Sequence, residues 1–163
     1  MFTKNSKISL LLINKIRFDF SWSENHDIDI VVFSLDKKGK IKETNCSQNL
    51  SNDYITFNKS NDFLEKIEHQ ESISFNFKNI KDINKLYICA ISNTLINKIE
   101  NFKLTIINEI TNEVIKEDYI EDIEDSSSLH ICTLNKDGFD WEINMELNSV
   151  NGKIEDLRDI LSD

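Results

Sequence analysis

Apolar and polar residues alternate one by one along several stretches of this chain, and this alternation restricts the fold more than any other feature. In 16–22, 73–77 and 141–147 every second residue is large and apolar. Successive side chains of a β-strand point to opposite faces, so these stretches predict half-buried antiparallel strands. By contrast, 28–35 and 86–91 are nearly continuous apolar runs, which are expected of central strands covered on both faces or packed in a sandwich core.

Shorter apolar stretches predict the remaining strands, which lie at 8–13, 54–57, 102–108, 114–119 and 129–134. The pattern as a whole predicts about nine or ten strands. Turn signals separate them at 37–40, 108–112 and 135–138, and the last of these joins two strand patterns closely enough to form a hairpin. Many short strands with tight turns predict an all-β fold, a two-sheet β-sandwich.

Helix is expected at two places only. A single turn is predicted at 80–85, and a short C-terminal helix at 153–161 has its apolar residues on one face, so it is expected to dock on the sandwich. The region 45–62, rich in Asn and Ser, is predicted to be a long irregular loop. No proline, repeat or Gly- or Ser-rich linker divides the 163 residues, so 1–163 is predicted to form one domain.

The chain carries 29 acidic and 19 basic residues, a net charge of -10. Nucleic-acid binding depends on Lys and Arg, so this balance argues against a nucleic-acid partner and favours cations or basic protein surfaces. The first apolar run, 8–13, is too short to span a bilayer and no small-residue cleavage site follows it. The three cysteines, without C-x-x-C spacing, fit a reducing compartment. We therefore expect a cytoplasmic protein without an integral membrane segment.

Enzyme motifs are absent from the sequence. P-loop, dinucleotide-binding and nucleophile-elbow motifs all require glycines at fixed positions, and the three glycines are isolated from one another. The three histidines lack the short spacings of zinc sites. Cys89 and Cys132 lie inside strand patterns, as small buried hydrophobes do. The acidic stretch 117–125 is predicted to be a solvated loop. We expect a protein that is not an enzyme.

Asp27 and Asp29 stand at the start of the longest apolar run. Aspartate is depleted in strand interiors, so the pair marks the end of a strand. Residues two apart on a strand project to the same side, here about 7 Å apart. Calcium takes about six to eight oxygen ligands, so a calcium site also needs ligands from other segments. The candidates by position are Asp53, Asn61, Asp62 and Glu71. The alternative is a solvated strand entrance without an ion.

Four segments together resemble the TerD-type domain of bacterial tellurite-resistance and chemical-stress proteins. The family's G-L-G-W and F-D-L-D-x-x-x-F-L-L strands are similar to 19–22 and 26–35 here. Its D-D-E segment and the following K-I-x-F-x-x-x-I strand resemble 69–91. Its F-I-R-I-x-N and L-Y-R-x-x-G-x-W-x-F hairpins resemble 102–115 and 134–143. Order and spacing agree over nearly the whole chain.

The resemblance implies a two-sheet β-sandwich with a calcium site at one acidic end. Asp27 and Asp29 match the aspartates of the family's D-L-D, and Glu71 matches the glutamate of its D-D-E. Asn49 lies in the segment that replaces its Y-N-N, and 61–62 takes the place of its G-D-N. The implied metal ligands are Asp27, Asp29, Glu71, Asp62, Asn61 and Asn49.

This chain also departs from the family pattern. The Gly- and Asp-rich loop before D-D-E is shortened to 63–70, and Asp19 and Ser21 replace both glycines of G-L-G-W. The resemblance therefore implies a divergent, TerD-like stress-response binding module with weak calcium binding and protein partners. The alternative is a degenerate, metal-free TerD-like protein that serves as a structural or scaffolding subunit of a larger assembly.

Overall fold

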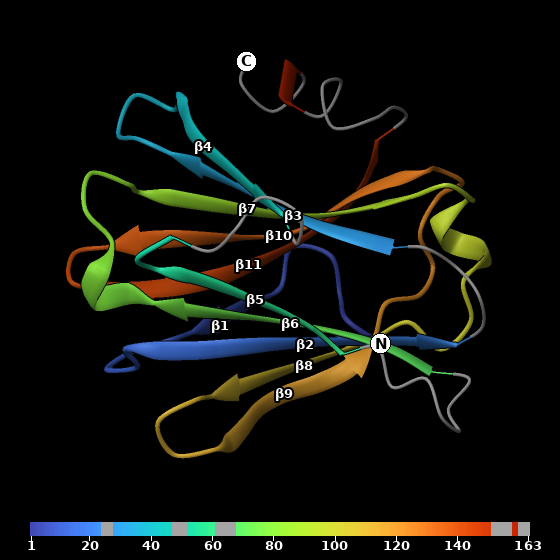
Figure 1. The fold of residues 1–163 in the computed structure, drawn as a ribbon, viewed down its shortest axis with the longest axis horizontal. Helices are drawn as coiled ribbons and strands as arrows, with labels where there is room; N and C mark the ends of the chain where they lie inside the picture. Colours follow the sequence, from blue (N-terminus) through green and yellow to red (C-terminus); the bar gives the residue numbers. More distant parts are fainter. Residues whose placement is uncertain (24–27, 47–51, 61–67, 151–157, 160–163) are drawn as a thin grey trace.

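The computed structural model describes residues 1–23, 28–46, 52–60, 68–150 and 158–159, and it shows two antiparallel sheets packed face to face (Figure 1). The six-stranded sheet has the order β1 (Lys7–Ser9), β11 (Asp140–Val150), β10 (Ser128–Asp137), β7 (Lys85–Ser92), β3 (Ile28–Leu35) and β4 (Ile41–Cys46). The five-stranded sheet has the order β5 (Ile55–Ser60), β6 (Glu68–Asn76), β2 (Lys15–Ser23), β8 (Lys103–Asn108) and β9 (Glu113–Tyr119). The predicted all-β sandwich is confirmed.

The described residues contain eleven strands, slightly more than the sequence predicted, because β4 was missed. Its sequence, IKETNC, has no regular apolar alternation. The strand forms because its backbone pairs with β3 along an edge of the six-stranded sheet. β4 extends to Cys46 and β5 begins at Ile55, so the irregular loop predicted at 45–62 is too long at both ends.

The predicted helical turn at 80–85 is wrong in position. A 3-10 turn, η1 (Phe77–Asn79), precedes it, and the Asn76 side chain caps this turn by accepting a hydrogen bond from the Lys78 backbone N–H. A second 3-10 turn, η2 (Ile96–Lys98), was not predicted. Of the C-terminal helix predicted at 153–161, only Arg158 and Asp159 lie within the described residues, and a helix over this range is not shown.

A core rich in aromatic residues fills the space between the sheets. Phe18 and Phe20 of β2 are fully buried, and Phe18 makes an edge contact with Phe75 of β6 at a ring-centroid distance of 5.7 Å. Phe77 of η1 stacks on Trp141 of β11 at 5.0 Å, which joins the two sheets at one end of the sandwich. Edge and offset ring contacts add to the stabilisation from burial itself.

The apolar run of β3 serves two separate clusters. Ile28, Ile30 and Val32 belong to the core between the sheets. Val31, Phe33 and Leu35 face the other way and form, with Cys89 of β7, a second buried cluster on the outer face of the six-stranded sheet. This arrangement confirms that β3 is covered on both faces, as its sequence predicted.

A β-bulge interrupts β10 where its register shifts against both neighbouring strands, between His130 and Cys132. Ile131 and Cys132 both belong to the core between the sheets. The extra residue brings His130 and Thr133, three positions apart, together on the outer face, where His130 Nε2 lies 3.0 Å from Thr133 Oγ1. A bulge changes the direction of side chains in this way.

The turns of the sandwich gather at its two ends (Figure 1). At the left end of the view lie the loop 10–14, η1 and the hairpin turns β3–β4, β8–β9 and β10–β11. At the right end lie η2 and the segment 120–127, which joins β9 to β10. We call the left group the basic end and the right group the acidic end, because of the charged residues described below.

Candidate functional site

Of the two predicted ligands within the described residues, Glu71 and Asp29, Glu71 lies in the interior. It lies on β6 opposite Phe20 of β2, on the same strand face as the buried residues Ile73 and Phe75, and its exposed fraction is 0%. An ionised carboxylate in such a position is costly unless a positive charge or hydrogen-bond donors compensate it. Burial of an acidic side chain in the core therefore marks Glu71 as a residue with a specific role.

Asp29 lies on the other side of the six-stranded sheet. It stands on β3 between Ile28 and Ile30, which face the core, so it shares the outer face with Val31 and with its cross-strand neighbour Ile91. Its side chain is partly exposed. Asp29 is thus outside the sandwich and Glu71 is inside it, and the structure does not bring these two predicted ligands together.

Four of the predicted ligands, Asp27, Asn49, Asn61 and Asp62, lie outside the described residues, and their assignment stays a prediction. Among the residues that the structure does describe, no group of three or more His, Cys, Asp or Glu side chains is placed to hold a metal ion.

The acidic end has exposed carboxylates beside two clefts. The clefts measure about 510 and 460 Å³ and share three lining residues, Glu121, Asp122 and Ile123. Ile120 anchors this segment, since it is buried and its backbone N–H donates to the Phe102 carbonyl at 2.7 Å. Both shared carboxylates are exposed, as expected of a solvated loop. The loop predicted at 117–125 is nevertheless too long, because 117–119 belong to β9.

The amino terminus lies beside the same segment. The terminal ammonium group of Met1 is 2.8 Å from Asp118 Oδ1. Hydrogen bonding to this ammonium group lowers the pKa of Asp118. One of the carboxylates of 117–125 therefore pairs with a positive charge of the protein itself.

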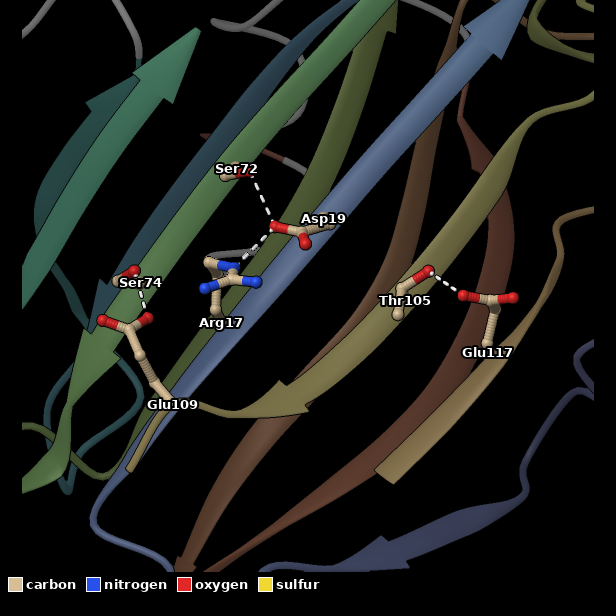
Figure 2. Close-up of polar contacts among 7 residues, drawn as sticks. All are labelled: Arg17, Asp19, Ser72, Ser74, Thr105, Glu109 and Glu117. Carbon is tan, nitrogen blue, oxygen red and sulfur yellow. Dashed lines mark hydrogen bonds and ion pairs between the residues drawn. The ribbon is translucent and has the colours of Figure 1, made fainter. Parts of the chain in front are cut away.

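The outer face of the five-stranded sheet is polar, and seven of its residues are drawn in Figure 2. Asp19 Oδ1 accepts hydrogen bonds from Arg17 Nε at 2.9 Å and from Ser72 Oγ at 2.7 Å. Elsewhere on this face Ser74 donates to Glu109 at 2.6 Å, and Thr105 donates to Glu117 at 2.8 Å. Because protein donors hold these carboxylates, and Ser72–Asp19 and Thr105–Glu117 join neighbouring strands, the face stabilises strand pairing and is a poor candidate for chemistry.

The two cysteines predicted as buried hydrophobes, Cys89 and Cys132, are both fully buried. Burial raises the pKa of each thiol, so neither is a reactive thiolate. His130 is the histidine whose side-chain surroundings the structure describes. It is buried, and desolvation lowers its pKa to about 4. This histidine is a neutral structural residue at physiological pH.

Sequence reasoning missed the exposed residues at the basic end. The β3–β4 turn and its surroundings form a cleft of about 330 Å³ lined by Asp36, Lys37, Lys38, Lys40, Lys42 and Asp82. Asp36 Oδ1 accepts backbone hydrogen bonds from Lys38 and Lys40, which lower its pKa and fix the turn. The run Lys37-Lys38-Gly39-Lys40 was visible in the sequence but predicted only a turn.

These residues define a two-sheet antiparallel β-sandwich protein with a lysine-rich turn at one end, an exposed acidic segment at the other and a buried glutamate. A model of the TerD domain matches residues 1–160. The chain therefore belongs to the TerD domain family, the family of tellurite-resistance and stress proteins that its segments resemble. A search of curated proteins found no match. Within the described residues, no helix has the length and apolar content needed to cross a membrane.

Proposed function

We propose that this protein is a non-enzymatic, cytoplasmic TerD-type binding module of the stress response, with weak calcium binding at one end and protein partners. Family membership over residues 1–160 supports the general role. The observation that carries the metal proposal is Glu71, a fully buried carboxylate that lies only three residues into β6 from the strand's start. Carboxylate oxygens are the ligands that calcium prefers in proteins.

The residues fit such an ion only in part. Glu71 supplies at most two of the six to eight oxygens that calcium takes, so most of the ligands would come from Asp27, Asn49, Asn61 and Asp62. Asp29 faces the outside of the sandwich. We therefore expect Asp29 to contribute least among the six predicted ligands. A site with few protein carboxylates binds calcium weakly, in the range typical of extracellular modules rather than of buffers.

A calcium-titrated thermal melt tests this proposal, with magnesium as the control for non-specific ionic effects. Calcium at ten times its dissociation constant should stabilise the wild-type protein by about 1.4 kcal/mol. Glu71→Gln keeps the shape of the side chain but removes its charge, and it should abolish the calcium response, as should Asp27→Ala. Asp29→Ala is the matched control and should retain the response. A melt that calcium leaves unchanged at millimolar concentration would contradict the metal proposal.

The second candidate is a metal-free TerD-like protein that serves as a structural subunit. This candidate is favoured because Asp29 lies on the outer face of the sandwich and Glu71 in its interior, so the two described members of the predicted ion site are apart. Docking would then use an exposed strand edge, because such an edge offers unpaired backbone groups to another chain. β9 is an edge strand with Val114 57% exposed. Under this proposal Val114→Lys should block assembly with the partner, and calcium should have no effect.

A further inference from the structure

Exposed apolar side chains gather at the basic end. Leu11 and Leu12 in the loop 10–14 are 62% and 84% exposed, Ile110 in the β8–β9 turn is 61% exposed, and Phe139 in the β10–β11 turn is exposed as fully as in an extended chain, at 101%. These turns lie at the left end of Figure 1. Single exposed apolar residues are ordinary, but four large ones on neighbouring turns call for an explanation.

Hydrogen bonds hold the turns next to one another. The Leu12 backbone N–H donates to Asp140 Oδ1 at 3.1 Å, and Leu10 donates to the Trp141 carbonyl at 3.0 Å, so the loop 10–14 lies beside the turn that carries Phe139. On the other side, the Glu109 N–H donates to the Lys15 carbonyl at 3.1 Å, which ties the β8–β9 turn to the start of β2.

The backbone at Leu12 adds a second observation. Its φ of 62° lies in the left-handed region, which a leucine rarely adopts. The bond to Asp140 holds this conformation, and the result is a leucine that projects into solvent. A strained backbone that exposes a large apolar side chain makes Leu12 a candidate for contact with another surface.

Exposed lysines occur on turns of the same end of the sandwich. The β3–β4 turn and its flanks, 36–42, hold four lysines and one aspartate. Further exposed lysines of this end are Lys15, Lys78, Lys81, Lys85 and Lys136. At the acidic end, by contrast, 121–125 holds four carboxylates and no lysine, in a chain whose net charge is -10. The basic end also carries carboxylates, and Lys4 and Lys98 lie near the acidic segment, so lysines predominate at one end without being confined to it. The carboxylates of the basic end are Asp36, Asp82, Glu109, Glu113, Asp137 and Asp140.

We propose that the basic end docks this protein on the surface of an anionic lipid bilayer. Phe139, Leu11 and Leu12 insert at the boundary between headgroups and acyl chains, and the lysines contact lipid phosphates. Peripheral membrane binding needs two contributions, the burial of apolar side chains and the electrostatic attraction to a negative surface. The acidic end points away from the membrane, which limits repulsion between the lipid and the negative chain.

The arrangement favours a lipid surface over a protein groove. The exposed apolar side chains are divided among three turns, the loop 10–14, the β8–β9 turn and the β10–β11 turn, so each turn can enter a fluid interface independently. The flexible lysine side chains need no fixed partner geometry to meet lipid phosphates. This site lies at the opposite end from segment 120–127, and it does not depend on the proposed calcium binding.

Flotation with lipid vesicles tests the proposal. The full chain should float with vesicles of phosphatidylcholine and phosphatidylglycerol at low salt, and should not float with phosphatidylcholine alone. Screening by 0.5 M salt should weaken binding roughly tenfold or more. Phe139→Ser should weaken it roughly tenfold, as should Leu12→Asn, which suits the left-handed backbone. The charge reversals Lys37→Glu and Lys38→Glu, combined, should weaken it at least as much.

Matched controls come from the opposite end of the sandwich. Leu95 is 38% exposed beside η2, and Lys98 is exposed within it, so Leu95→Ser and Lys98→Glu should leave flotation unchanged. All these positions are exposed, so the variants should melt close to the wild-type temperature. The proposal is overturned if the wild type does not bind anionic vesicles at low salt. It is also overturned if Phe139→Ser and the lysine reversals bind these vesicles as tightly as the wild type does. Retained vesicle binding together with loss of a protein complex in those variants would assign this end to a protein partner instead.

Discussion

His130 should make the folded protein sensitive to acid in a defined pH range. The imidazole is 6% exposed on the outer face of the six-stranded sheet, 4.8 Å from the Tyr87 ring and 3.0 Å from Thr133 Oγ1. Burial disfavours the charged imidazolium and lowers the pKa of His130 from 6.5 to about 4, although the negative charge of Glu146 opposes part of this shift. The folded state therefore holds His130 in its neutral form.

The size of the effect follows from these two pKa values. Between pH 6.5 and pH 4 an unfolded chain binds a proton at His130 and the folded protein does not, so acid favours unfolding. The difference corresponds to about 3 kcal/mol of stability, which is fully present above pH 6.5 and is lost as the pH falls toward 4. A loss of this size is a large fraction of the stability of an ordinary domain.

Urea denaturation at a series of pH values measures this loss of stability. The free energy of unfolding of the wild type should fall by about 3 kcal/mol more than that of His130→Gln between pH 7.5 and pH 4. Other carboxylates titrate in both proteins and cancel in this comparison. Thr133→Val removes a hydrogen bond to the ring but keeps the imidazole, so it should retain the full acid sensitivity. Parallel curves for the wild type and His130→Gln would refute the assignment of a buried neutral histidine.

Three further predictions concern the sandwich itself. The Tyr54 hydroxyl hydrogen-bonds to Ser34 Oγ and Glu43 Oε2, both at 2.9 Å, and burial raises the pKa of Tyr54 from 10 to about 12. The stability of the wild type should therefore fall as the pH rises from 10 through 12. In urea denaturation, Tyr54→Phe should be about 1 kcal/mol less stable at pH 7 and should not show this alkaline loss of stability. Gly138 has φ 63° with open space around an added Cβ, so Gly138→Ala should cost only its backbone strain, about 1 kcal/mol, as a small drop in melting temperature. Phe75→Ala should cost about 3 to 5 kcal/mol of unfolding free energy, and a loss under 1 kcal/mol would contradict the close packing of the core.

The fold was predictable where side-chain burial follows sequence directly. The run 28–35 became β3 with the bounds that were expected, because its apolar side chains, buried on both faces, outweigh the polar Asp29 and Ser34. β4 could not be predicted in the same way, since its residues are mostly polar and the strand depends on pairing with β3. The bulge at Ile131 also escaped prediction, because it is defined by the register of two neighbouring strands.

The candidate site was predictable only in part, for a related reason. Strand alternation placed Asp27 and Asp29 on one side of a strand, but a strand that is apolar on both faces does not show which face meets the other sheet. The structure puts Asp29 on the outer face, with Val31. Glu71 was identified through resemblance, yet nothing in its local sequence showed that it would be fully buried. Which face is covered is a tertiary property.

The strand order has a consequence for how the chain is made. In the six-stranded sheet, β1 pairs with β11, and Lys7 lies opposite Asn144, while β10 joins that pair to β7. On the ribosome β1 therefore has no native partner until β11 has been synthesised. Pairings between such distant segments fold slowly. The six-stranded sheet should thus close late, and β7 would keep an unpaired edge until β10 is available, which is the interval in which a chaperone has most to protect.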